Sequence, residues 1–133
     1  MKSIIFFILS AISLAVFANP LKGTWKYVSG EYATPNGNVK AEAPAVTSTK
    51  IISDTHFSYI TLHSNKFAYA GGGTYVIEGN KFIETVKYGN LEDYIGRTMA
   101  FTFKIEGDLW YHTLYENGKF VESEIWKKVP SKL

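Results

Sequence analysis

Residues 71–88 read Gly71-Gly-Gly-Thr-Tyr-Val-Ile-Glu78, then Gly79-Asn80, then Lys81-Phe-Ile-Glu-Thr-Val-Lys-Tyr88. Two runs rich in β-branched and aromatic residues flank a Gly-Asn turn, and this pattern predicts a β-hairpin because glycine tolerates the positive φ that such turns require. Side chains alternate between the faces of a strand, so Phe82, Glu84, Val86 and Tyr88 share one face. That face is mostly apolar and is predicted to point inward, which places the Glu84 carboxylate among aromatic rings.

The rest of the chain repeats this design of short β-rich runs joined by tight turns. Turn residues stand at Ser53-Asp54-Thr55, Gly107-Asp108 and Asn117-Gly118. The predicted strands span residues 21–29, 49–53, 56–63, 71–78, 81–88, 97–106, 109–115 and 120–129. Sequential strands joined by hairpins predict an all-β fold, an eight-stranded antiparallel up-and-down β-barrel that leaves no exposed edge and can enclose one small ligand. A two-sheet sandwich is the alternative fold.

Two segments are predicted to be connections rather than strands. Residues 30–48 carry Pro35-Asn-Gly37 and Pro44 and predict a long loop, while residues 89–96 predict one helical turn with Asn90 as its N-cap. These segments are interpreted either as lids at a barrel mouth, with Tyr32 and Tyr94 as contacts, or as solvated loops. The glycines at 71–73 predict a bulge or bend, since neither a Lys-Ser/Thr pair nor a helix follows them as in a phosphate loop.

The first eighteen residues are predicted to be a secretory signal peptide. Lys2 gives a positive start, residues 4–16 are almost entirely apolar, and Val16-Phe17-Ala18 supplies small residues for a signal peptidase. The apolar run is shorter than the roughly 20 residues that span a bilayer, so no stable membrane anchor is expected after cleavage. We therefore expect one domain over residues 19–133, exported to the periplasm or the extracellular space.

Composition narrows the classes of partner. The chain has 14 basic and 12 acidic residues, and removal of Lys2 leaves 13 against 12, a net charge of +1 without a basic block. Nucleic acid and anionic membranes are therefore not expected as partners. No cysteine is present, which excludes disulfides and thiol chemistry. No cofactor and no metal site are expected, because His56 and His63 would face opposite sides of one strand and His112 is remote in sequence.

Short motifs carry a family resemblance. Gly23-Thr-Trp25 on the first strand, a long following segment and a basic residue near the end resemble the lipocalins and the wider calycin group. The resemblance implies that Trp25 plugs one barrel end beside Lys127 or Lys128. Ala70-Gly-Gly-Gly-Thr-Tyr75, with Phe82-Ile-Glu84 and Tyr88, resembles secreted bacterial lipocalin-like domains of uncharacterised function.

The last strand is also similar to that of intracellular fatty-acid-binding proteins. In that group an inward arginine and tyrosine grip a carboxylate, and the matching positions here are Glu124 and Trp126. A carboxylate at the arginine position would repel a fatty-acid head group, so simple fatty-acid binding is not expected.

Strand parity places Glu84 inward, and it places Glu124 inward if Trp126 faces the interior. Parity does not settle which face of the strand at residues 109–115 is inside, but the adjacent tight turn and the bulky indole favour the face of Trp110 and His112. Together these expectations give a polar group of Glu84, His112 and Glu124 within an aromatic wall. The candidate ligand-binding residues are Trp25, Tyr27, Tyr75, Glu84, Tyr88, Phe101, Phe103, Trp110, His112, Glu124 and Trp126. Buried charges need partners, so these groups either satisfy one another or orient a ligand. Two inward carboxylates favour a cationic or hydroxyl-rich ligand, which aromatic rings can hold by stacking or cation–π contact.

The sequence therefore predicts an exported binding protein for a small, partly apolar molecule. Two alternatives belong to other classes. A small barrel enzyme could use the glutamates as the acid and base of glycoside hydrolysis, or a His–Glu pair for proton abstraction in an isomerase or cyclase. A protein-interaction module would instead use the loops as its contact surface. No nucleophile motif is present, and an enzyme is the less favoured reading.

Overall fold

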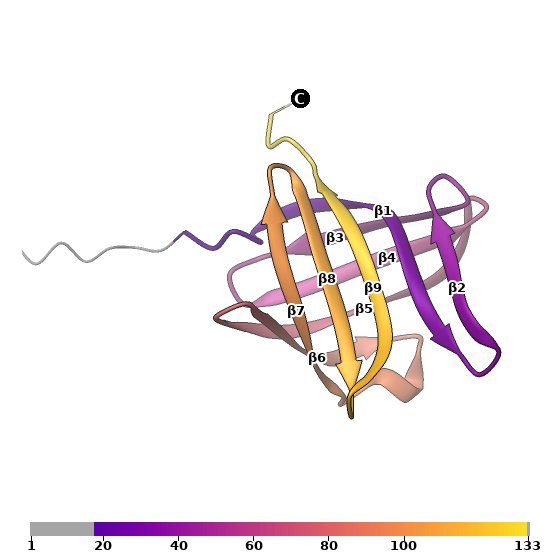
Figure 1. The fold of residues 1–133 in the computed structure, drawn as a ribbon. Helices are drawn as coiled ribbons and strands as arrows, with labels where there is room; N and C mark the ends of the chain where they lie inside the picture. The colour runs from indigo at the N-terminus through magenta and orange to yellow at the C-terminus, as the bar shows by residue number, and fades with distance from the viewer. Residues whose placement is uncertain (1–17, 133) are drawn as a thin grey trace, which may run out of the picture.

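The computed structural model describes residues 18–132, and it consists almost entirely of antiparallel strands around one interior (Figure 1). The predicted signal peptide lies outside the described residues except for Ala18. The elements are β1 (Gly23–Thr34), β2 (Gly37–Glu42), β3 (Val46–Ile52), β4 (His56–His63), β5 (Lys66–Glu78), β6 (Lys81–Gly89), the 3-10 turn η1 (Glu92–Tyr94), β7 (Thr98–Glu106), β8 (Leu109–Glu116) and β9 (Lys119–Lys128). No helix among these residues is long and apolar enough to cross a membrane.

The sheet closes on itself. Strands β3 to β9 pair in sequence order, β1 pairs with β3 on one edge, and β1 also pairs with β9 on the other, as Trp25↔Lys128 to Tyr32↔Glu122. Strands β1 and β3 to β9 thus form a closed 8-stranded antiparallel barrel. The predicted meander barrel is confirmed, and the sandwich is wrong.

The predicted loop at residues 30–48 is wrong. Strand β1 continues to Thr34 and turns back as β2, which pairs with its second half from Ser29↔Glu42 to Thr34↔Gly37. The first half of β1, residues 23–26, pairs with β3 instead. Nearly every residue of β2 is exposed, so this strand lacks the apolar alternation that predicts strands from sequence.

The predicted hairpin at residues 71–88 is confirmed, with Tyr75↔Glu84 and Glu78↔Lys81 as pairs of β5 and β6. The register shifts between Gly72 and Gly73, so the predicted bulge is also confirmed. At Gly73 a Cβ atom would lie 1.9 Å from the carbonyl oxygen of Thr85. The shift places Val86 and Tyr88 on opposite faces, and Tyr88 is 50% exposed, which makes its predicted inward position wrong.

Aromatic side chains fill one end of the barrel. The ring centroid of Trp110 lies 5.4 Å from that of Trp25 and 5.4 Å from that of Phe82, and all three side chains are buried. The Lys128 ammonium lies 4.7 Å from the Trp25 ring centroid. Trp25 therefore packs beside Lys128 as the lipocalin resemblance implied, whereas Lys127 forms a surface ion pair with Asp108 at 3.7 Å.

The segment between β6 and β7 contains one short turn, η1, as predicted, but Asn90 does not cap it. Leu91 occupies the N-cap position without a side-chain hydrogen bond. The Asn90 side chain instead accepts a hydrogen bond from the Ala70 N–H at 2.9 Å and donates one to the Ala68 carbonyl at 3.3 Å. Asn90 therefore ties this segment to β5.

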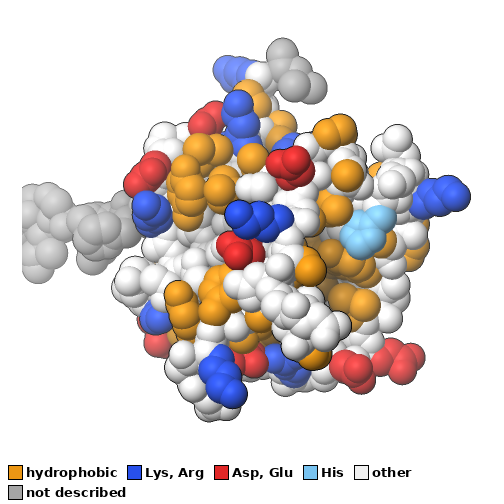
Figure 2. Space-filling view, turned by 45° about the vertical axis from the view of Figure 1, so that its right-hand side comes forward, with side chains coloured by type: hydrophobic (Ala, Val, Ile, Leu, Met, Phe, Trp, Pro, Cys, Tyr) orange, Lys and Arg blue, Asp and Glu red, His pale blue; other side chains and the backbone are white. Residues whose placement is uncertain are grey.

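Charged side chains of both signs are interspersed over the described surface that Figure 2 shows, and no continuous basic patch is visible on that face. Exposed ion pairs such as Arg97–Glu116 at 2.8 Å contribute to this mixture. Surface pairs of this kind add little stability, so the aromatic interior accounts for most of the fold's cohesion.

Candidate functional site

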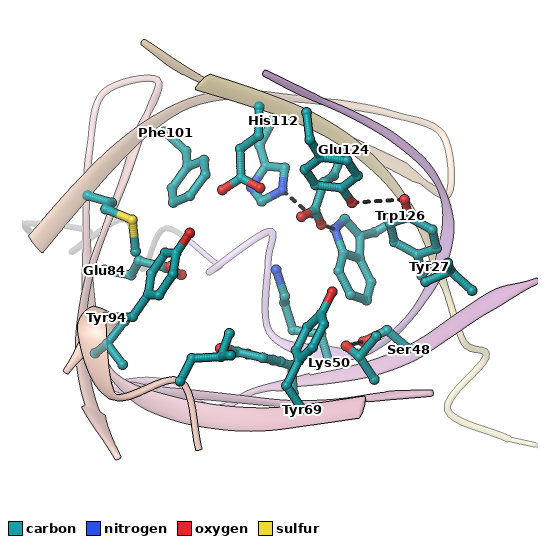
Figure 3. Close-up of a pocket in the computed structure, with 18 residues that line it drawn as sticks. Tyr27, Ser48, Lys50, Tyr69, Glu84, Tyr94, Phe101, His112, Glu124 and Trp126 are labelled. Carbon is teal, nitrogen blue, oxygen red and sulfur yellow. Dashed lines mark hydrogen bonds and ion pairs between the residues drawn. The ribbon is translucent and has the colours of Figure 1, made fainter. Parts of the chain in front are cut away.

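A cavity of about 400 Å³ lies within the barrel, beside the aromatic end (Figure 3). Each of the barrel strands contributes at least one side chain to it, and η1 contributes Tyr94. The lining residues are Tyr27, Tyr32, Val46, Ser48, Lys50, Tyr59, Thr61, Tyr69, Glu84, Val86, Leu91, Tyr94, Met99, Phe101, His112, Glu122, Glu124 and Trp126. Closure of the sheet therefore brings together side chains that are up to about a hundred residues apart in the chain.

Six of the predicted ligand-binding residues line this cavity: Tyr27, Glu84, Phe101, His112, Glu124 and Trp126. Four others, Trp25, Tyr75, Phe103 and Trp110, belong to or pack against the hydrophobic core and do not line it. Tyr88 lies outside it, as described above. The predicted polar group of Glu84, His112 and Glu124 is thus assembled, but the surrounding aromatic wall is smaller than predicted.

Glu124 is the most strongly held of the acidic groups. Its Oε2 accepts a hydrogen bond from Trp126 Nε1 at 2.7 Å and lies 3.4 Å from His112 Nε2 (Figure 3). Burial alone raises the pKa of Glu124, but the contact with His112, the charge of Lys50 and the Trp126 N–H outweigh burial and lower that pKa to about 2. Glu124 is therefore a carboxylate at neutral pH.

His112 is neutral at the same pH. Its ring stacks on Phe101 with 4.6 Å between ring centroids, and burial lowers its pKa despite the neighbouring Glu124. Its Nδ1 atom is buried without a hydrogen-bond partner among the described residues. The His112–Glu124 contact is thus between an imidazole and a carboxylate rather than between two full charges.

Lys50 is a site residue that the sequence analysis missed. Its side chain is 6% exposed and points into the cavity, with the ammonium 4.2 Å from the Trp126 ring centroid and 5.0 Å from that of Trp110 (Figure 3). The ammonium forms no ion pair with a carboxylate of residues 18–132. Its sequence signal was its alternation with Ser48 and Ile52, but the predicted strand began only at Thr49 and was too short to show it.

Glu84 is a buried carboxyl group in the lining of the cavity. It is 7% exposed, and no hydrogen bond or ion pair joins its carboxyl group to another residue of the described chain. Burial raises the pKa of Glu84 to about 7, with Glu124 adding to the rise and Lys50 opposing it. Glu84 therefore exchanges a proton near neutral pH.

Glu122 is the second missed residue. It lines the cavity two residues before Glu124 on the same face of β9, so the parity that predicted Glu124 applies equally to Glu122. Burial raises the pKa of Glu122 well above its usual value, and the negative charges of Glu124 and Glu84 raise it further. Glu122 therefore holds a proton while Glu124 is ionised.

Five tyrosines complete the lining: Tyr27, Tyr32, Tyr59, Tyr69 and Tyr94. The hydroxyl oxygens of Tyr27 and Tyr32 lie 2.8 Å apart and share a hydrogen bond. Burial raises the pKa of Tyr27 and of Tyr59 to about 12 each. Tyr32 and Tyr94, which were predicted as contacts from the two connections, both face the cavity, although Tyr32 stands on a strand.

Among the described residues, no group of three or more His, Cys, Asp or Glu side chains is placed to hold a metal ion. His56 and His63 are both exposed at the ends of β4. The titratable side chains that line the cavity carry carboxyl, ammonium, imidazole and phenol groups.

Similarity to a known protein family adds to what the geometry of the cavity shows. Residues 20–133 match a family described as a domain of unknown function, DUF4488. The chain belongs to the DUF4488 family. No curated protein matches the chain.

A solved structure supports the fold of this DUF4488 chain. It is a lipocalin-like protein from Bacteroides uniformis, 19% identical, which matches over 82% of this chain and 98% of its own with a TM-score of 0.55. At this identity the likeness shows the fold alone. The lipocalin resemblance carried by Gly23-Thr-Trp25 is therefore confirmed at the level of the barrel.

Proposed function

We propose that this protein is an exported binding protein that holds a small, partly apolar organic molecule in the barrel cavity. The observation that carries the proposal is the pair of buried, ionisable side chains of Lys50 and Glu84, which face the cavity without a hydrogen bond or ion pair to another described residue. Buried polar groups are costly unless they are paired. A bound molecule would supply the missing partners.

The size and lining of the cavity support the same proposal. Small-molecule sites have volumes of about 300–1,000 Å³, and they combine apolar walls with a few convergent polar groups. The cavity of about 400 Å³ has aromatic walls that include Phe101 and Trp126 and a polar group that includes His112 and Glu124. A molecule with an apolar ring or short chain and one or two polar groups would match this lining.

The experiment is native mass spectrometry of the protein purified from its own host, followed by denaturation and identification of any released compound. The matched control is Val46→Trp, which fills part of the cavity from a partly buried position on β3. We expect a stoichiometric compound in the wild type and its loss in the variant. A wild-type protein that arrives empty and retains nothing from a metabolite extract of the host would contradict the proposal.

Export is tested separately by fractionating host cells and sequencing the N-terminus of the protein. We expect the chain to begin at Asn19 and to appear in the periplasm or the medium, because residues 2–18 have the features of a cleaved signal. A cytoplasmic chain that retains Met1 would contradict this part of the proposal.

Acid–base catalysis on the bound molecule is a second candidate, favoured by the pKa of Glu84 near 7. It predicts that the compound released from Glu84→Gln differs chemically from the compound released from the wild type. Recovery of one unchanged compound from both proteins would leave binding as the sole function.

A further inference from the structure

We propose that the ligand carries a protonated amine that sits against Glu84 and Glu122 in the barrel cavity. This inference rests on the proposed function, because it names the chemical class of molecule that the same cavity takes. It selects an organic cation over a neutral hydroxyl-rich molecule.

The first argument is the imbalance of ionisable groups around one cavity. Three carboxyl groups, those of Glu84, Glu122 and Glu124, line it together with a single ammonium, that of Lys50. His112 adds no positive charge, because burial lowers its pKa. One ammonium can neutralise only one carboxylate, so repulsion between neighbouring carboxylates favours protons on the other carboxyl groups.

The second argument is how the carboxyl groups are partnered. Glu124 already has the Trp126 N–H at 2.7 Å and the His112 ring beside it. Glu84 is 7% exposed and has no protein partner among residues 18–132, although it faces the cavity. A ligand ammonium would give Glu84 both a counter-charge and a hydrogen-bond donor, and it would replace the proton that burial favours.

The third argument concerns the opposite choice, an anionic ligand. Among residues 18–132, a ligand carboxylate would have only Lys50 as a counter-ion in the cavity, and it would add a fourth acidic group to the three already present. The Lys50 ammonium already lies over the faces of Trp126 and Trp110 and near the charge of Glu124. A ligand ammonium, in contrast, could also form cation–π contacts with the rings of the tyrosines that line the cavity.

The titratable side chains that face the proposed position of the ligand ammonium set the pH dependence of binding. They are Lys50 from β3, Glu84 from β6, His112 from β8, and Glu122 and Glu124 from β9. The remaining titratable groups are the five tyrosines from β1, β4, β5 and η1, and burial raises the pKa of those on β1, β4 and β5. Strand β7 contributes only Met99 and Phe101. Since a primary amine stays charged below pH 9, its affinity should rise with pH as Glu84 and Glu122 lose their protons.

The test uses three fluorescent probes on one scaffold: dansylcadaverine with its primary ammonium, N-acetyl-dansylcadaverine without a charge, and N-dansyl-6-aminohexanoate with a carboxylate. We expect the ammonium probe to bind the wild-type protein about tenfold or more tightly than either analogue at pH 8. We also expect its affinity to fall about tenfold between pH 8 and pH 6, because the pKa of Glu84 is about 7. The apparent binding enthalpy at pH 7 should differ between phosphate and Tris buffers as released protons are taken up.

Two isosteric variants test whether Glu84 and Glu122 bind the ligand ammonium. Glu84→Gln and Glu122→Gln should each weaken the ammonium probe about tenfold and leave the neutral probe unchanged. Glu78→Gln, at the exposed end of β5 and outside the cavity, is the matched control and should change neither probe. The buffer dependence is measured on the wild-type protein, so it tests the proposal even if a variant fails to fold.

The outcomes separate this inference from the proposed function. If the neutral or anionic probe binds as tightly as the ammonium probe, or if no protons are released, the inference of an amine ligand is wrong. The proposal of small-molecule binding is not contradicted by that result. If none of the probes binds and the host-purified protein is also empty, both proposals fail.

Discussion

At the scale of the residue, Glu84 is a buried carboxyl group whose ionised form lowers the stability of the folded protein. Its pKa of about 7 lies above the ordinary 4.5, so the folded protein binds this proton more tightly than the unfolded chain does. Folding stability should therefore fall as pH rises from about 4.5 to 7, by roughly 3 kcal/mol for this group alone. Glu84→Gln should remove that loss and be more stable than the wild type at pH 8, as measured by urea unfolding at several pH values.

Below pH 4.5 the two proteins should converge, because the wild-type carboxyl is then protonated in both states. Glu78→Gln serves again as the control and should follow the wild-type curve, since Glu78 is exposed. Parallel curves for Glu84→Gln and the wild type from pH 4.5 to 8 would show that Glu84 is not desolvated in the folded protein.

The pKa of Glu124 is shifted in the opposite direction from that of Glu84, so its effect on folding stability has the opposite dependence on pH. Its pKa of about 2 lies below the ordinary 4.5, so the stability it contributes is present above pH 4.5 and is lost as pH falls toward 2. Glu124→Gln should cost about 2 kcal/mol at pH 6, because it removes the charged acceptor of the Trp126 N–H. The difference from the wild type in urea unfolding should shrink below pH 4, and a difference that persists at pH 2 would contradict this account.

At the scale of the element, the β5–β6 hairpin depends on the bulge at Gly72 and Gly73. A Cβ atom at position 73 would overlap the Thr85 carbonyl oxygen, which belongs to the backbone of the neighbouring strand and cannot turn away. Gly73→Ala should therefore lower the free energy of unfolding by more than about 2 kcal/mol or prevent folding. Circular dichroism of the purified variant, followed by urea unfolding, measures this.

The matched control is Gly79→Ala in the turn of the same hairpin. Gly79 has φ +58°, and no atom of the described residues lies within 4 Å of the position that a Cβ would take, so alanine there meets backbone strain. We expect a cost of about 1 kcal/mol. If Gly73→Ala were no worse than Gly79→Ala, the close approach of the two strands at the bulge would be refuted.

At the scale of the whole molecule, the barrel divides into a packed end and a hollow remainder. Lys128 covers Trp25 at the packed end and does not line the cavity. Lys128→Met should therefore lower the free energy of unfolding by about 1 kcal/mol, through the lost cation–π contact, without changing dansylcadaverine affinity. Thermal unfolding and a fluorescence titration of the same sample check both parts, and a variant that binds the probe much more weakly would show that the two ends are coupled.

Much of this architecture could be predicted because strand alternation is a local property. Met99, Phe101 and Ile105 alternate with small or polar residues, and they do form the inward face of β7. Strand β2 could not be predicted in the same way, because it has almost no buried side and is held by pairing with the second half of β1. Tyr88 was misplaced because a bulge interrupts the alternation, and a bulge changes parity without changing composition.

The sequence by itself determined that the chain forms antiparallel strands joined by hairpins, that Glu84 shares a strand face with Phe82, and that Glu124 shares one with Trp126, because turn chemistry and a period of two are written in neighbouring residues. Only the tertiary structure decided which inward side chains pack the core, as Trp110 does, and which face the cavity, as Lys50 and Glu122 do. That division depends on how strands distant in sequence are staggered when the sheet closes, which no local pattern records.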